Sequence, residues 1–332
     1  MDLVKKYFNH RKSHFSELPN SILIETVMGC NLRCEMCPVP QSKLLMNGRT
    51  AAMMSLSTFQ KILDQIDDKP RRLHLNQMGE PLLNKSICEF VALSKKAGHN
   101  VSFTTNGTLM NEDVSRQLLM AGLDQVTFSV DGYKETTYES IRIGANYERV
   151  RSNVEGFCRM KSELNKHTAI HIDCILSDLT KYEIASMQNY WKGKVDSVNI
   201  IPLDDWAGKY ELPSKFGLRN WRARTSGDAR YPCDLLWTTA AISAEGYVMY
   251  CCHDYKLLSA LPNVNEIPLG KIWEDNVSEE RKKHIDGMIN KDPCLHCDAW
   301  KTRQPYFRQP SLIKNCSNAV FQKCQMVLRW IC

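Results

Sequence analysis

The chain has 332 residues, of which 43% are hydrophobic and 24% are charged, and its formal net charge is +6. This length excludes a disulfide-stapled miniprotein and leaves room for a substantial core plus a second, smaller domain. The chain has no apolar run long enough for a membrane span and no secretory signal at its start, so we expect a cytoplasmic protein whose thiols stay reduced; its 14 cysteines then indicate metal binding rather than disulfides.

Short β-type runs alternate with helical patterns over the first two thirds of the chain. The runs are 21–27, 72–77, 100–105, 125–130, 169–175 and 195–201, and the helical patterns are 55–66, 84–97, 111–122, 135–165 and 178–191. Ser55 and Asn111 are typical N-cap residues, and Gly98 and Gly122 stand where helices should end. This alternation predicts right-handed βαβ units around a parallel sheet. Because two further units are missing, we expect an α/β fold built as a partial (β/α)6 barrel.

Polar and cysteine-containing segments follow four of the predicted strands. The loop "CNLRCEMC" follows the first strand, and "QMGEP" (77–81), "TTNGT" (104–108) and "SVDG" (129–132) follow the next three. Parallel α/β folds assemble their active sites from the loops at the carboxyl ends of several strands. We therefore predict one composite site at this edge of the sheet.

The first of these loops carries Cys30, Cys34 and Cys37 within eight positions. A structural zinc site needs four ligands, and no fourth cysteine or histidine lies nearby. Three thiolates on a 4Fe–4S cluster leave one iron open, which is a catalytic arrangement. The polar residues between the cysteines argue against a core-packing role. We therefore predict an iron–sulfur cluster here, with zinc as the alternative.

The spacing Cys30-x3-Cys34-x2-Cys37 after a first strand resembles the signature of radical S-adenosylmethionine (SAM) enzymes, and the resemblance extends over about 20–205. It implies that the open iron binds SAM and that Glu80 of Gly79-Glu80 receives the methionyl ammonium group, although Met78 replaces the first glycine of the usual Gly-Gly-Glu. The implied cofactor contacts are Met36, Gly79, Glu80, Thr104, Asn106, Ser129, Asp131 and Arg142. Each of these roles has a structural alternative. Glu80 could be an ordinary loop carboxylate, Ser129 and Asp131 could form a turn, and Arg142 could lie on a helix surface. The implied chemistry is reductive cleavage of SAM to a 5′-deoxyadenosyl radical that takes hydrogen from a substrate C–H bond, with electrons from an external donor such as flavodoxin or ferredoxin.

The carboxy-terminal third contains a second set of cysteines. Cys233, Cys251 and Cys294-x2-Cys297 resemble the auxiliary-cluster domain of the SPASM/twitch subgroup, with a hairpin that turns near Glu245-Gly246. Arg303 and Phe307 replace the two later cysteines of the full SPASM pattern, which favours a shorter, twitch-like domain with one auxiliary 4Fe–4S cluster. A zinc site is again the alternative, and Cys316, Cys324 and Cys332 leave a second auxiliary cluster open.

These patterns divide the chain into five parts. They are an extension (1–20), the radical SAM partial barrel (21–205), a linker or active-site cover (206–232), the auxiliary-cluster domain (233–305) and a basic tail (306–332). Basic residues also gather at 215–230. A solvated surface explains both basic stretches as well as phosphate or nucleic acid does, so we predict no nucleic-acid partner.

The substrate is the least determined feature. We expect oxidation or epimerisation of a small polar molecule of sugar, aminosugar or cyclitol type, contacted by the 206–230 segment, and an anionic substrate is left open. Cys252, beside Cys251 on the predicted hairpin strand, is a candidate hydrogen-atom donor for epimerisation. His171 and Asp173 share one side of the fifth strand, either facing the substrate or satisfying each other. Radical modification of a peptide, and a noncatalytic iron–sulfur or zinc scaffold, are the alternatives.

Overall fold

The computed structural model describes residues 17–40, 48–66, 69–206, 210–217, 232–297 and 299–301. Its central feature is an eight-stranded sheet in the order β10-β9-β1-β4-β5-β6-β7-β8. Six of these strands are parallel and match the predicted runs: β1 (Ser21–Ile24), β4 (Arg72–His74), β5 (Asn100–Thr105), β6 (Gln125–Ser129), β7 (Ala169–Leu176) and β8 (Ser197–Pro202). The α/β class and the partial barrel are confirmed.

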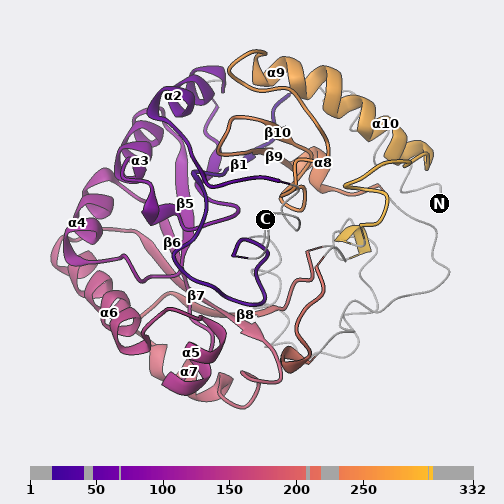
Figure 1. Ribbon diagram of the computed structural model, residues 1–332. Coiled ribbons are helices and arrows are strands. Elements are labelled where there is room, and N and C mark those ends of the chain that lie inside the picture. The colour runs from indigo at the N-terminus through magenta and orange to yellow at the C-terminus, as the bar shows by residue number, and fades with distance from the viewer. Residues whose placement is uncertain are drawn as a thin grey trace, which may run out of the picture.

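Helices cover the outer face of this curved sheet (Figure 1). They are α2 (Leu56–Gln65), α3 (Ile87–Lys96), α4 (Glu112–Ala121), α5 (Glu135–Ile141), α6 (Tyr147–Glu163) and α7 (Ile184–Trp191). Ser55 and Asn111 cap α2 and α4 by accepting the backbone N–H groups of Thr58 and Val114, and Gly122 ends α4 in the left-handed region. The predicted helix over 135–165 is two helices, because the chain turns at Gly144 (φ +95°) and Asn146 caps α6.

The strands separate an apolar outer layer from a polar inner face. On β7, Ile170, Ile172 and Cys174 are buried in the main core, which also contains Val154 and Phe157 of α6. The residues between them along β7 are only partly buried, as the pleat of a strand requires when one face packs on helices and the other lines an interior. The inner face of the barrel therefore keeps its polar side chains accessible.

The predicted hairpin is present as β9 (Thr239–Ile242) and β10 (Val248–Met249), which pair antiparallel. β9 also pairs in parallel with β1, which the sequence did not predict, so the hairpin extends the barrel sheet. A second small sheet, β2 (Val27–Met28) with β3 (Ala52–Met53), was also not predicted, because two-residue strands carry no periodicity. Short α8 (Leu235–Thr238) precedes the hairpin, and α9 (Leu269–Ile272) and α10 (Ser278–Asp286) follow it.

A buried ion-pair cluster ties the start of the cysteine loop to the hairpin turn. The Arg49 guanidinium lies 2.5 Å from the Glu25 carboxylate and 2.8 Å from that of Glu245, and it donates to the Tyr255 carbonyl at 2.7 Å. Glu25 follows β1 and Glu245 sits in the β9–β10 turn. The cluster therefore fixes the hairpin relative to the barrel.

Some predictions lie outside the described residues. These are most of the extension (1–16), the basic stretch from 218 to 231, and the tail from 302 onward with Cys316, Cys324 and Cys332. In the part of the chain that the structure describes, none of the helices combines the length and the apolar character needed to cross a bilayer.

Candidate active site

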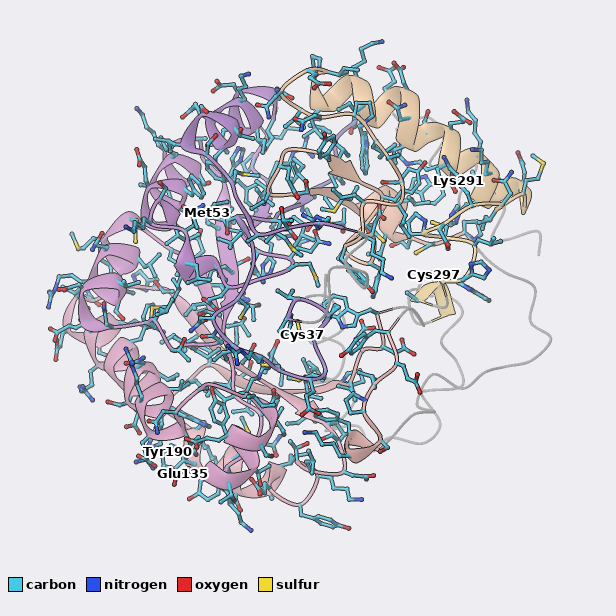
Figure 2. The ribbon with its side chains drawn as sticks, in the orientation of Figure 1. Cys37, Met53, Glu135, Tyr190, Lys291 and Cys297 are labelled. Atoms are coloured by element: carbon cyan, nitrogen blue, oxygen red, sulfur yellow. The ribbon has the colours of Figure 1, made fainter. Side chains whose placement is uncertain are left out.

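The cysteine loop begins directly after β2 and lies inside the ring of strands, where Figure 2 labels Cys37. Its backbone folds tightly, because the Cys37 N–H donates to the Cys34 carbonyl at 3.1 Å and the Leu32 N–H reaches the Cys30 Sγ at 3.4 Å. Burial raises the pKa of all three thiols, that of Cys37 to about 12, and the two neighbouring thiols add to the shift of Cys37. Three converging thiols become thiolates together only on a strongly positive centre, so this set fits a metal cluster.

Gly79 lets the loop after β4 pack directly against the cysteine loop. Its φ is +90°, and a Cβ at this position would lie 2.4 Å from the Val27 carbonyl oxygen and 2.5 Å from that of Gly29. The following N–H, that of Glu80, donates to the Gly29 carbonyl at 2.8 Å. Only glycine permits this approach, which carries Glu80 to the cysteine loop.

The Glu80 carboxylate is buried and held by three donors. It accepts the Thr105 hydroxyl at 2.6 Å, the Asn106 N–H at 2.8 Å and the Leu82 N–H at 3.2 Å. Burial raises the pKa of Glu80, and these hydrogen bonds oppose that rise. The Asn106 side-chain amide also lies 3.7 Å from the Cys30 Sγ. The carboxylate is therefore fixed beside the thiols, where it can receive a cation.

Arg142 and Asp131 form an ion pair on the other side of the cysteine loop. The Arg142 Nε lies 2.6 Å from Asp131 Oδ2, and Asp131 Oδ1 accepts the Ile175 N–H at 2.7 Å. Asp131 is fully buried, so its carboxylate orients the guanidinium from within the protein. Arg142 hydrogen-bonds the Cys34 thiol and opposes the rise in the pKa of Cys34 that burial causes. A cation is thus placed where it can bind an anionic group next to the cysteines.

The remaining predicted cofactor residues lie around the same loop. Met36 is buried with Leu32 and Cys34, and its carbonyl accepts the Trp206 indole N–H at 3.3 Å. Thr104 and Ser129 are partly buried on β5 and β6, and the Thr104 N–H donates to the Asn76 side chain at 2.8 Å. The structure therefore gathers all predicted cofactor residues at the carboxyl edge of the sheet.

Three contributing residues were not predicted from the sequence. Thr105 donates to Glu80, and its position within "TTNGT" was the available signal. Trp206 and Tyr210 bind the Met36 and Glu35 carbonyls from a segment far along the chain, the Tyr210 hydroxyl at 2.6 Å. No local pattern marks that contact. The described part of the predicted cover therefore does lie against the cysteine loop.

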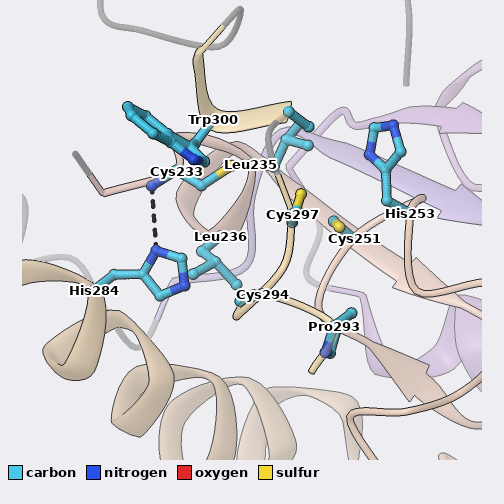
Figure 3. Close-up of a pocket in the computed structure, with 11 residues that line it drawn as sticks. Cys233, Leu235, Leu236, Cys251, His253, His284, Pro293, Cys294, Cys297 and Trp300 are labelled. Atoms are coloured by element: carbon cyan, nitrogen blue, oxygen red, sulfur yellow. Dashed lines mark hydrogen bonds between the residues drawn. The ribbon is translucent and has the colours of Figure 1, made fainter. Parts of the chain in front are cut away.

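The second cysteine set lines one cavity (Figure 3). Cys233, Cys251, Cys294 and Cys297 share it with two histidines, His253 and His284, and with apolar side chains, namely Leu235, Leu236, Pro293, Ala299 and Trp300. Burial raises the pKa of the Cys251 and Cys294 thiols, and the other cysteines of the set add to both shifts. The Cys233 N–H donates to Nδ1 of His284 at 3.3 Å. Four thiols in an apolar wall fit a fully ligated cluster better than a site that must admit a polar cosubstrate.

The prediction that Cys252 lies on a hairpin strand is wrong, because the residue lies in a turn after β10. The Asp254 N–H donates to the Cys251 carbonyl at 3.1 Å, which closes this turn. Strand alternation therefore does not govern its side chain, which packs in one apolar cluster with Leu23 and Met249. Its sulfur lies 3.5 Å from His253 Nδ1, and its carbonyl accepts the Gln77 side chain at 2.7 Å. Cys252 is disulfide-bonded in this structure, so it could give up a hydrogen atom only after reduction, and the hydrogen-donor role stays a prediction.

Family comparisons agree with both cysteine sites. The model of the radical SAM superfamily matches residues 24–172, and that of the SPASM iron–sulfur cluster-binding domain matches residues 233–298. The chain belongs to the radical SAM superfamily. Its cofactors are accordingly a 4Fe–4S cluster with SAM and an auxiliary iron–sulfur cluster of the SPASM/twitch type.

Among curated proteins, the chain is 25% identical over 193 residues to the tungsten-containing aldehyde ferredoxin oxidoreductase cofactor-modifying protein of Pyrococcus furiosus, covering 55% of this chain and 52% of that one. It is 28% identical over 228 residues to a probable GTP 3′,8-cyclase of Methanothermobacter marburgensis, covering 68% and 65%. The chain thus spans between half and two thirds of the length of these curated relatives.

Solved radical SAM structures share the fold. The SuiB structure of Streptococcus suis bound to precursor peptide SuiA aligns with a TM-score of 0.67 at 16% identity, over 89% of this chain and 74% of that one. The structure of BtrN in complex with AdoMet and 2-DOIA aligns with a TM-score of 0.54 at 18% identity, over 82% and 89%. At these identities the likeness concerns the arrangement of the barrel and the auxiliary domain.

Proposed function

We propose that this radical SAM protein cleaves SAM reductively, takes a hydrogen atom from a C–H bond of a small polar substrate, and oxidises or epimerises that substrate. The observation that carries the proposal is the meeting of three thiols, a held carboxylate and an oriented guanidinium at one edge of the barrel. A noncatalytic cluster carrier needs neither of the two charged side chains.

Each charged group has a separate task in this proposal. Cys30, Cys34 and Cys37 would hold the cluster, Glu80 would bind the ammonium of SAM, and Arg142 would bind its carboxylate. Asp131 acts through Arg142, because both of its oxygens accept hydrogen bonds from within the protein. When bound, the cluster and SAM supply a 5′-deoxyadenosyl radical. The protein fixes the direction from which that radical meets the substrate.

The four auxiliary cysteines would hold the second cluster, which suits an oxidation because that reaction must dispose of an electron. In an epimerisation, Cys252 would return a hydrogen atom to the substrate radical, and this would require prior reduction of the disulfide in which Cys252 is held. An external flavodoxin or ferredoxin would supply the electron for SAM cleavage. Cys252→Ala separates the two reactions: loss of an inverted product with continued SAM cleavage supports the donor role, whereas unchanged turnover removes it.

A substrate of sugar, aminosugar or cyclitol type is supported by the fold match to BtrN, whose structure contains AdoMet and 2-DOIA. The second candidate is modification of a peptide, supported by the fold match to SuiB bound to its precursor peptide. Deuterium-labelled candidates of both kinds, incubated with the anaerobically reconstituted protein, SAM and dithionite, distinguish them. The substrate is the compound whose deuterium appears in 5′-deoxyadenosine. Transfer only from peptides would replace the first candidate by the second.

A further inference from the structure

Four polar side chains form a continuous hydrogen-bonded file on the inner wall of the barrel, across β7 and β8. Asn199 donates from Nδ2 to Asp173 Oδ1 at 2.8 Å, and the Ser197 hydroxyl donates to Asn199 Oδ1 at 2.9 Å. The Ser197 oxygen lies 2.7 Å from His171 Nδ1. All four residues are partly buried, whereas their neighbours on β7 are buried against the helices. The two residues singled out in the sequence are thus joined through β8 and not to each other.

The direction of these bonds decides what the file offers to the interior. Because the single hydroxyl hydrogen of Ser197 goes to Asn199, the Nδ1–H of His171 must donate to Ser197. His171 Nε2 is then an acceptor, and burial lowers the pKa of His171, which keeps the ring neutral. The file therefore ends in two acceptors, an imidazole nitrogen and a carboxylate.

The charge of the wall is negative. Neither β7 nor β8 contains a lysine or an arginine. Two cations on other elements act on the wall, Arg142 on Asp173 and Lys161 on His171, and each is ion-paired with another carboxylate, that of Asp131 and that of Asp196. Burial raises the pKa of Asp173 to about 6, which leaves it ionised at neutral pH. A group that enters between these strands meets acceptors and one carboxylate.

The wall also adjoins the proposed SAM site. Asp173 is in register with Ser129 on β6, and two residues further along β7 the Ile175 N–H binds Asp131, the partner of Arg142. A molecule held by Asp173 would therefore lie on the substrate side of the cofactor residues. This position separates the wall from Glu80, which lies at the loop after β4.

We propose that Asp173, supported by Asn199, and His171 form the specificity wall of the substrate site and select a donor-rich substrate with an ammonium group. This inference rests on the function proposed above and narrows its substrate class to amino-substituted polyols. A charge-assisted hydrogen bond to a partly desolvated carboxylate is stronger than a neutral one, which discriminates an amine from a hydroxyl of the same shape.

Matched probe pairs test this directly. The full chain, reconstituted anaerobically and saturated with SAM, is titrated by calorimetry with scyllo-inosamine against scyllo-inositol and with glucosamine against glucose. We expect at least one amine to bind about tenfold more tightly than its hydroxyl partner. Asp173→Asn should abolish that preference, and Asp173→Glu, which keeps the charge, should retain part of it. Asp64→Asn, an exposed carboxylate on α2, is the matched control and should change nothing.

Three binding results would contradict this proposal, and a change in SAM affinity is a fourth. The binding results are the failure of both amines to bind, equal binding of amine and hydroxyl partners, and a preference that survives in Asp173→Asn. A loss of SAM affinity in Asp173→Asn would also overturn it, by assigning Asp173 to the cofactor. Formation of 5′-deoxyadenosine without substrate is measured in the same samples. If 5′-deoxyadenosine forms but the amines are not preferred, only the role of Asp173 and His171 is rejected. If no 5′-deoxyadenosine forms, the proposed function itself is rejected.

Discussion

The two cysteine sites of this chain are built on opposite plans. The first places three thiols on one short loop and surrounds them with fixed charges, Glu80 and Arg142. The second gathers four thiols from separated segments in a wall of mostly apolar side chains, such as Leu235 and Trp300, together with His253 and His284. A site that must admit a charged cosubstrate needs an open ligand position and charged partners, while a site that only stores or passes electrons needs neither.

Cysteine substitutions should give the largest difference in activity between the two sites. Cys34→Ala should reduce the formation of 5′-deoxyadenosine to the background of a protein-free sample. Cys294→Ala should lower the iron content yet retain most SAM cleavage, while turnover of substrate is lost. Iron analysis and mass spectrometry of the same preparations measure both. Cys88→Ala on α3 is the control, and equal loss of SAM cleavage in the Cys34 and Cys294 variants would break the distinction.

The Arg49 cluster connects the two regions, so its loss should be costly. Arg49→Met leaves the fully buried Glu25 carboxylate without its cation and should lower the free energy of unfolding by about 3–5 kcal/mol. Denaturant titration of the reconstituted protein measures this. Lys181→Met, which removes an exposed ion pair with Asp178, should leave the midpoint unchanged. Equal midpoints for the two variants would show that the hairpin is held by other contacts.

Gly79 tests the close packing of the loop after β4 against the cysteine loop. Gly79→Ala should destabilise the protein by about 3 kcal/mol, because left-handed backbone strain and a clash with the Val27 carbonyl combine. Gly98→Ala has a similar φ of +83° but open space around the added Cβ, so we expect about 1 kcal/mol. Thermal unfolding of both variants isolates the clash. A Gly98 variant as unstable as the Gly79 variant would contradict the close approach.

The smallest expected effect concerns pH. The raised pKa of Asp173, caused first by burial, is about 6, so its carboxylate is ionised above that pH and neutral below it. Asp131 adds to this rise and Arg142 and Asn199 oppose it, while burial lowers the pKa of the neighbouring His171. Amine preference should therefore be present above about pH 6 and fade below it. Calorimetry from pH 5 to 8 measures this, and a preference that rises on acidification would exclude Asp173 as its source.

The first site could be predicted from sequence because its signals are local. Cys30, Cys34 and Cys37 share one loop, and the segments carrying Gly79, Asn106 and Asp131 each follow a strand with clear periodicity. The alternation of strands and helices then brings them to one edge without any long-range information. The direct hydrogen bonds among Glu80, Thr105 and Asn106 needed the structure, because spacing does not specify side-chain partners.

The second cysteine site and its hairpin are harder to predict from sequence, because their contacts join residues that are distant in sequence. The pairing of β9 with β1 joins Ile22 to Ala240, and no pattern in either strand names its partner. The turn that carries Cys252 follows a strand only two residues long, so the alternation of side chains between the two faces of a strand ends before Cys252. The file from His171 to Asp173 likewise depends on register with β8, which only the fold determines.

The most direct test is the formation of 5′-deoxyadenosine by the full chain, reconstituted anaerobically and reduced with dithionite in the presence of SAM. We predict 5′-deoxyadenosine and methionine in equal amounts, lost in Cys34→Ala. Protein that carries its full complement of iron–sulfur clusters and binds SAM, yet forms no 5′-deoxyadenosine, would contradict the catalytic reading of the first site.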